Sequence, residues 1–409
     1  MDETILQLIT ILIVGYLSAH FLIGKLQSRF FFTSGIEYII LGVLVGPQIT
    51  DRLMTSQAVA QLGPIMSLAI GAIGLLVGLQ LRFRELGRVP AEFYRVAFVE
   101  VLFTFLLIGG SFAAVFWYFL SGHLVGQERV VAVFTSAAVL GTTGAVSART
   151  AINVVKKRYN AKGTLTDLLR FEVRFGELLG IVLFGFIFCI FHVGEMISIR
   201  SLTKTEWVAV NIVFGILLGT LFFLFLGREQ SKEKLLLALI GIVVFSSGAA
   251  YYLNLSPLFI NLVLGIMLAN TSKIRNQLLE VLRSIEKPFY VVLLVFAGAS
   301  WEMSFTRRWY VIAGIVAGYI LLRYMGKLIG GFIAYKTSDS PEHLARRVGV
   351  GFLSQGQVAI AMIINYQQVY KNDFTNVVIS CVLASVIINE FLSPRLTKGL
   401  LVDAEEIAV

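Results

Sequence analysis

Thirteen apolar runs dominate this chain of 409 residues, and the connections between them are no longer than about 16 residues. Charged residues make up 14% of the chain, whereas a soluble domain carries about 25%. Apolar runs of this length cross a bilayer as helices, because a helix satisfies its own backbone hydrogen bonds. We therefore expect an all-α polytopic membrane protein in a lipid bilayer, with spans at 5–24, 34–49, 58–81, 93–120, 129–151, 168–192, 206–226, 234–252, 257–271, 285–303, 309–336, 345–370 and 375–393.

The lysines and arginines predict which side of the membrane each connection faces. These residues gather in cytoplasmic connections. With the N-terminus outside, 21 of them fall in inside connections and 7 in outside connections. We therefore expect an outside N-terminus, a cytoplasmic C-terminus and a bacterial-type inner membrane. The net charge of +9 then belongs to the cytoplasmic surface, and no nucleic-acid partner is expected. The first span follows Asp2 and Glu3 rather than a basic segment, which favours a retained helix over a signal peptide.

The short connections leave no room for an inserted soluble domain. Residues 1–393 are predicted to form a single transmembrane domain, and residues 394–409 a short cytoplasmic tail. The sequence contains no glycine-rich phosphate loop, and its four histidines are scattered. We therefore expect no enzymatic activity, no cofactor and no metal beyond a transported ion.

Short sequences recur seven spans apart along the chain. LGVL at 41–44 corresponds to LGIM at 264–267, and Gly78 near the end of the third predicted span corresponds to Gly298 in the tenth. An odd offset reverses the topology, so the pattern predicts an inverted repeat like those of secondary transporters. Close packing through small residues is the alternative explanation. The predicted repeats are 5–192 and 234–393, joined by a linking helix at 206–226.

Small and polar residues interrupt the fifth and twelfth predicted spans. Unwound backbone at membrane depth is tolerated only where protein or a water-filled cavity satisfies it. We expect two crossed broken helices whose ends direct partial charges toward a shared midplane site. Tight helix packing would explain the glycines but not two glutamines in one span. The predicted interruptions contain Gly141, Thr142, Thr143 and Gly144, and then Gly351, Ser354, Gln355, Gly356 and Gln357.

The sixth predicted span carries charged residues within an apolar run, LLRFEVRFGELLGIVLFGFIF at 168–188. A carboxylate at membrane depth costs about 2.5–3.5 kcal/mol on insertion scales, so it usually faces a cavity, a partner or an ion. Glu177 lies about 15 Å from the inner edge at 1.5 Å per residue, close to the midplane. Competition between H⁺ and a monovalent cation for this carboxylate would be sufficient for antiport, and with one carboxylate the simplest exchange is 1:1 and electroneutral.

Several of these segments resemble the sequences of a known family. The chain is similar to the monovalent cation:proton antiporter superfamily, which includes the sodium/hydrogen exchangers, over nearly its whole length. The motifs in their order are GVLVGP at 42–47, IGLLVGLQL at 73–81, MGKLIGG at 325–331 and GFLSQGQVAIAM at 351–362. The resemblance implies thirteen spans, exchange of Na⁺ or K⁺ for H⁺ by alternating access, and a homodimer.

The resemblance also implies roles for particular residues. Glu177 falls on the ion-binding aspartate of the family, and Gly176 falls on a position that the family fills with asparagine or a second aspartate. Thr142 falls on the threonine at the helix crossing, and Thr143 replaces an aspartate of the exchangers. Glu172 falls on an upstream glutamate that the electroneutral branch pairs with an arginine, here Arg323. Lys327 falls on a lysine of many electrogenic members.

Other interpretations remain open for the charged residues. Arg174 shares a helix face with Glu177 and could neutralise it permanently. Lys327 could extend toward the inner surface instead of serving the site. Glu100 and Glu390 lie near span ends and are predicted to be interfacial. The alternative function is a non-transporting or partner-gated membrane protein that keeps the fold and acts with a soluble regulatory or effector subunit.

Overall fold

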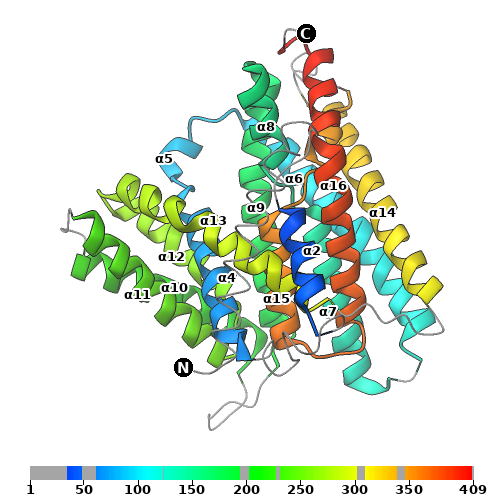
Figure 1. The fold of residues 1–409 in the computed structure, drawn as a ribbon, viewed down its shortest axis with the longest axis horizontal. Helices are drawn as coiled ribbons and strands as arrows, with labels where there is room; N and C mark the ends of the chain where they lie inside the picture. The colour runs from blue at the N-terminus through cyan, green and yellow to red at the C-terminus, as the bar shows by residue number, and fades with distance from the viewer. Residues whose placement is uncertain are drawn as a thin grey trace.

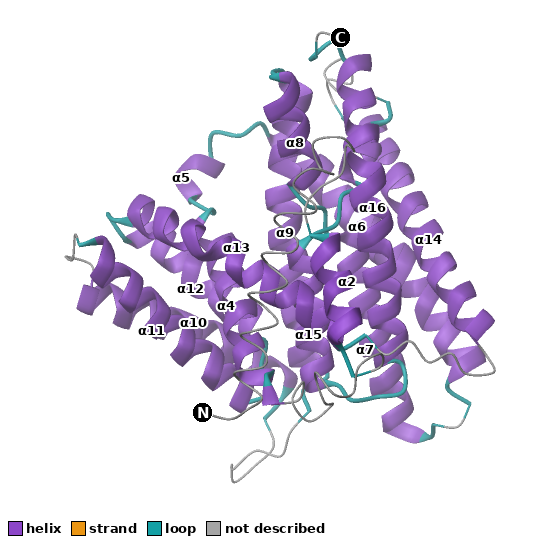
Figure 2. Cartoon of the chain, viewed as in Figure 1, coloured by secondary structure: helices purple, strands orange, loops and turns teal. Residues whose placement is uncertain are grey.

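The computed structural model describes residues 35–47, 61–122, 124–193, 202–226, 231–301, 309–338 and 346–407. Within these ranges the regular elements are helices, and no strand occurs among them (Figure 2). Seven helices are long and apolar enough to cross a membrane, and three shorter apolar helices accompany them. The first predicted span, 5–24, lies outside the described residues, so the count of thirteen spans stays a prediction.

The helices form two groups (Figure 1). In one group α12 packs against α4 and α10, and α2 packs along α13. This first group contains α2 (Ile36–Val45), α4 (Gly63–Leu79), α10 (Lys204–Leu226), α11 (Lys232–Tyr252), α12 (Pro257–Thr271) and α13 (Arg275–Ala299). A short helix, α5 (Phe83–Leu86), precedes the first helix of the other group.

The second group is built around α6, which packs against α7, α9 and α14. It contains α6 (Ala91–Val115), α7 (Gly126–Ala145), α8 (Thr150–Tyr159), α9 (Thr164–Ile190), α14 (Trp309–Lys336), α15 (Gln357–Val369) and α16 (Thr375–Asp403). A π-helical turn over Phe116–Leu120 extends α6, and a 3-10 turn over Val348–Phe352 precedes α15.

Two pairs of glycines bring helices of the first group into backbone contact. Gly42 of α2 faces Gly298 of α13, and Gly78 of α4 faces Gly265 of α12. A Cβ atom on any of the four would overlap backbone atoms of the facing helix, so glycine permits an approach that side chains would prevent. The predicted repeat places Gly42 opposite Gly265 and Gly78 opposite Gly298 in sequence. The two contacts therefore join equivalent helices in exchanged order, as an inverted repeat requires, and the repeat itself stays a prediction.

The backbone leaves the helical conformation near both predicted interruptions, but one break lies later in the chain than predicted, and the crossing of the two broken helices stays a prediction. Gly141 to Gly144 are not unwound: they form the last turns of α7, which ends at Ala145. Residues 146–148 lie outside the helix, with Val146 extended, and helix resumes with α8 at Thr150. Gly180 of α9 leaves the space that the Val146 side chain occupies. The second interruption, 353–356, separates the 3-10 turn from α15 and lies within the predicted segment.

Candidate functional site

The two interruptions hydrogen-bond to each other. The Ala148 amide donates to the Ser354 carbonyl at 2.9 Å, and the hydroxyl oxygens of Thr150 and Ser354 lie 2.6 Å apart. Gln355 adds a link from its Nε2 to the Thr143 carbonyl at 2.8 Å. Segments about 200 residues apart in the chain thus share one polar junction in which backbone groups outside helices find partners.

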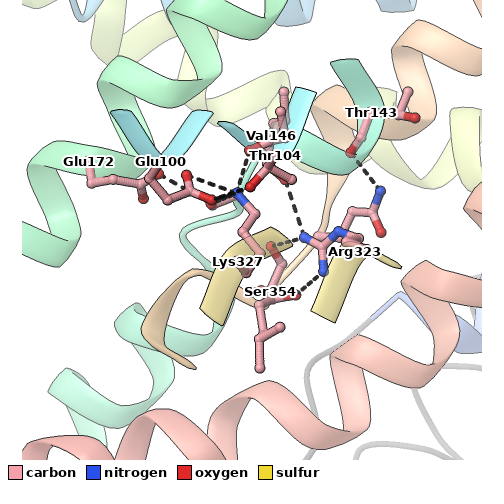
Figure 3. A network of polar contacts seen from close by, with 12 residues as sticks. Glu100, Thr104, Thr143, Val146, Glu172, Arg323, Lys327 and Ser354 are labelled. Carbon is pink, nitrogen blue, oxygen red and sulfur yellow. Dashed lines mark hydrogen bonds and ion pairs between the residues drawn. The ribbon is translucent and has the colours of Figure 1, made fainter. Parts of the chain in front are cut away.

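Two cations on α14 donate hydrogen bonds to backbone carbonyl groups at the interruptions. Arg323 donates to the carbonyls of Leu353 at 2.7 Å and of Val146 and Ser354 at 3.3 Å (Figure 3). Lys327 donates to the Ala145 carbonyl at the end of α7. Positive charge near the C-terminal carbonyls of a helix is favourable. These contacts explain why unwound backbone is stable inside the helix group.

Arg323 and Glu172 do not form the predicted ion pair. The ion pair in this layer joins Lys327 Nζ to Glu100 Oε1 at 3.0 Å. Arg323 donates instead to backbone carbonyls of the two interruptions.

Glu100, Glu172 and Lys327, with Thr104 and Ser147, make up what we name the sealed cluster. Thr104 donates to Glu100 at 2.9 Å, and Ser147 lies between Lys327 at 3.0 Å and Glu172 at 3.4 Å. The three charged side chains are 0% exposed. The prediction that Glu100 is interfacial is therefore wrong, and the alternative that Lys327 extends to the surface is excluded, since each buries its charge against the other.

Glu177 lies in a different environment on the same helix. Its side chain is buried, with the residue 3% exposed, and it lines a cavity of about 520 Å³ between α8, α9 and α13. Its ion-pair partner is Arg149, whose Nη2 lies 3.4 Å from Glu177 Oε2. Arg149 directly precedes α8, at the end of the first interruption, and its Nη1 donates to Gln80 at the end of α4. Arg174 lines the cavity but forms no ion pair with Glu177, so the suggested neutralising partner is replaced by Arg149.

Gly176 lies between the two acidic environments. A Cβ at this position would meet Glu172 Oε1 at 3.2 Å and Val101 Cγ2 at 3.4 Å. The glycine thus lets α9 pack closely on α6, and it supplies neither an amide nor a second carboxylate beside Glu177.

Thr142 and Thr143 are buried, and their hydroxyls bond within their own helix. Each donates to the Val139 carbonyl, at 3.0 and 2.7 Å, and Thr143 also lies 3.3 Å from the Tyr319 hydroxyl. Neither hydroxyl hydrogen-bonds to Glu177 among the described contacts. Their assignment as ion ligands stays a prediction.

The two glutamines of the second interruption have separate tasks. Gln355 accepts a hydrogen bond from Ser385 at 2.8 Å and donates to Thr143. Gln357 donates to Glu286 of α13 at 3.0 Å, and both residues line the cavity beside Glu177. Gly356, between them, faces Ala148 of the first interruption, and a Cβ there would lie 2.8 Å from the Ala148 Cβ.

Three residues at this junction are not among the site residues that the sequence predicts. Arg149 stands at the end of a predicted span, where a charge is unremarkable, and its pairing with Glu177 depends on the position of the interruption. Tyr319 lies within an apolar run, and its hydroxyl reaches both Thr143 and Gln355. Glu390, predicted to be interfacial, is 4% exposed and accepts from Thr150 at 3.0 Å, so that prediction is wrong. The one sequence signal for the burial of Glu390 is that this charged residue lies inside an apolar run.

The chemistry of the site follows from the Glu177 carboxylate and its arginine partner. A buried carboxylate beside a cavity, with an arginine as counter-ion, is the kind of group to which H⁺ or a weakly held cation can bind. Among the described residues, no group of three His, Cys, Asp or Glu side chains could hold a metal ion.

Comparison with known proteins places this geometry among transporters. The family described as sodium/hydrogen exchanger, transmembrane, matches residues 8–398. The high-affinity Na⁺/H⁺ antiporter NhaS3 of Synechocystis sp. is 25% identical over 304 residues, which cover 71% of this chain and 62% of that protein. The Na⁺/H⁺-K⁺ antiporter GerN of Bacillus cereus is 23% identical over 90% of each chain.

A solved structure shows the same fold. The sodium proton antiporter MjNhaP1 from Methanocaldococcus jannaschii at pH 8 superposes with a TM-score of 0.66, at 19% identity over 97% of this chain and 98% of its own. The match to the family covers nearly the whole sequence, and the fold agrees with it. The chain belongs to the sodium/hydrogen exchanger family.

Proposed function

We propose that this protein is a secondary antiporter that exchanges a monovalent cation, Na⁺ or K⁺, for H⁺, with Glu177 as the group that binds each in turn. The observation that carries the proposal is the position of Glu177. Its carboxylate is buried, it borders a cavity, and a single arginine at 3.4 Å balances its charge. A buried carboxylate needs a counter-charge or a proton, so H⁺, a cation and Arg149 compete for the same oxygen atoms.

Competition for the Glu177 carboxylate is the basis of the proposed exchange. When a cation replaces the proton on Glu177, one H⁺ leaves for each positive charge that binds. Gly176 offers no second carboxylate, which supports a 1:1, electroneutral exchange. Arg149 stabilises the empty site between the two loaded states, because a bare carboxylate in this environment would be costly.

Alternating access follows from the two helix groups. We propose that the group containing α6–α9 and α14–α16 moves against the group containing α2, α4 and α10–α13. The hydrogen bonds from Arg323 to both interruptions, and from Lys327 to the end of α7, support movement of the α6–α9 and α14–α16 group as one body. The backbone contacts at Gly42 and Gly78 support a rigid group of α2, α4 and α10–α13. A homodimer with an outside N-terminus, a cytoplasmic C-terminus and a location in a bacterial-type inner membrane are part of the proposal.

The experiment is cation-driven proton flux in proteoliposomes. A pH-sensitive dye inside the vesicles reports flux on addition of Na⁺, K⁺ or Li⁺, for wild type and for Glu177→Gln. We expect flux in wild type with at least one cation and no flux in the variant, which should keep the wild-type elution profile in size-exclusion chromatography.

The same vesicles test the stoichiometry and the alternative function. Clamping the membrane potential should leave a 1:1 exchange rate unchanged. Flux that survives in Glu177→Gln would show that Glu177 is not the carrier. Absence of flux from folded wild type with all three cations would favour a partner-gated membrane protein that keeps the fold.

A further inference from the structure

The cavity beside Glu177 is lined by an excess of positive charge. Its basic residues outnumber its two carboxylates, Glu177 and Glu286, by three. Both carboxylates are engaged, Glu177 by Arg149 at 3.4 Å and Glu286 by Gln357 at 3.0 Å. The basic residues that line it are Arg149, Arg170, Arg174, Arg283 and Lys287.

Two of these arginines have no counter-ion among the described residues. Arg174 and Arg283 form no ion pair with any described residue, whereas Arg170 lies 3.9 Å from Asp167. Like charges that face one space repel each other. A cation approaching Glu177 through this space meets the same repulsion. The cavity is therefore poorly suited to remain without an anion.

The basic residues come from both helix groups. Arg170 and Arg174 lie on α9, and Arg149 directly precedes α8, in the group that we propose to move. Arg283 and Lys287 lie on α13, in the other group. An anion bound among them would therefore bridge two bodies that must separate or slide during transport.

We propose that this cavity is a binding site for a multivalent phosphate anion, which bridges α9 and α13 and slows the exchange. Guanidinium groups match phosphate oxygens in pairs, which is why clustered arginines select phosphate. A cavity of about 520 Å³ is large enough for a small metabolite with two or more phosphates. Binding follows from the charges alone, and the effect on exchange rests on the proposed function.

Binding is measured first, without transport. Inorganic pyrophosphate is titrated into the detergent-purified protein by isothermal titration calorimetry, with sodium chloride at matched ionic strength as the reference. Wild type should bind saturably, and Arg283→Gln and Arg174→Gln should each bind about tenfold more weakly, because each loses charge-assisted hydrogen bonds to phosphate. Lys157→Gln is the matched control, since Lys157 is exposed on α8 and does not line the cavity. It should bind like wild type.

The outcomes separate this proposal from the proposed function. Saturable binding that weakens in Arg283→Gln and Arg174→Gln supports the site even where no flux is detected. Absence of saturable binding by wild type, or equal affinities in all four proteins, overturns it even where antiport is normal. In vesicles, pyrophosphate on the side of the cavity should lower the exchange rate of wild type several-fold and leave that of Arg283→Gln unchanged. Equal inhibition of both would overturn the bridging role.

Discussion

Glu172 and Glu177 lie five residues apart on α9 and show how two buried carboxylates can serve different purposes. Five residues correspond to a rotation of about 140°, so the two side chains point to different sides of the helix. Their exposed fractions are nearly the same, 0% and 3%. Glu172 belongs to the sealed cluster, in which Lys327 is 0% exposed, whereas Glu177 borders a cavity and has a partly exposed arginine as its partner. We propose that access rather than burial separates the two roles, with Glu177 exchanging ions and Glu172 stabilising the fold.

The largest effect expected is loss of stability in the sealed cluster. Lys327→Met leaves the Glu100 carboxylate buried without its partner, which costs about 3–5 kcal/mol. This corresponds to a fall in the unfolding temperature of about 4–6 °C, measurable by tryptophan fluorescence in detergent. Lys336→Met, near the exposed end of the same helix, should change it by less than about 2 °C.

A double variant separates charge from shape in the same cluster. Glu100→Gln combined with Lys327→Met removes both charges of the pair, and replacing a whole buried pair is often neutral. At least half of the lost unfolding temperature should return. A double variant as unstable as Lys327→Met would show that the hydrogen bonds of Lys327 to Ala145 and Ser147 matter more than the ion pair.

The role of Arg323 can be tested by a substitution that keeps its charge. Arg323→Lys keeps the positive charge that the predicted ion pair with Glu172 would need. The lysine cannot reach three carbonyls at once, because an ammonium group lacks the planar fork of arginine. Loss of at least one charge-assisted hydrogen bond should cost about 2 kcal/mol, or roughly 2 °C in unfolding temperature. An unchanged unfolding temperature would contradict the assignment of Arg323 to the two interruptions.

A smaller effect, on affinity, is expected at Arg149. Arg149→Gln removes the internal competitor of the transported cation at Glu177. The KM for the cation in the flux assay should fall about tenfold, equivalent to about 1.4 kcal/mol. Arg170→Gln lines the same cavity without touching Glu177 and should change KM by less than about twofold. A rise in KM for Arg149→Gln would mean that Arg149 positions the carboxylate instead of competing for it.

The smallest effect is expected at Glu172. The Lys327 ion pair is made with Glu100, so Glu172→Gln removes no ion-pair partner. Its exchange rate should stay within about threefold of wild type, and its unfolding temperature should stay close to that of wild type. A loss of exchange comparable to that of Glu177→Gln would contradict the proposal that Glu177 exchanges ions and Glu172 does not.

The sequence predicted the class of fold better than the partners of its charged residues. Helices such as α12 and α14 coincide with apolar runs that polar connections bound on each side, and these boundaries depend on local sequence. The partner of Glu177 depends instead on where α7 ends. The sequence predicted that interruption at Gly141–Gly144, but α7 continues to Ala145, and Val146 then packs against Gly180. With the interruption in this position, Arg149 pairs with Glu177.

The pairing of Arg323 and Lys327 could not be read from helix spacing either. Both lie on one face of α14, four residues apart, so periodicity cannot decide which of them meets a carboxylate. The choice depends on the carbonyl groups that the interruptions present, and those arise only from the tertiary fold.

Proton release on cation binding is the most direct test of the account. Na⁺ or K⁺ is added to detergent-purified protein in weakly buffered solution, and a pH indicator reports the protons released for each cation bound. The account predicts about one proton per cation for wild type and for Glu172→Gln, and none for Glu177→Gln. Proton release that persists in Glu177→Gln, or that disappears in Glu172→Gln, would contradict the assignment of exchange to Glu177.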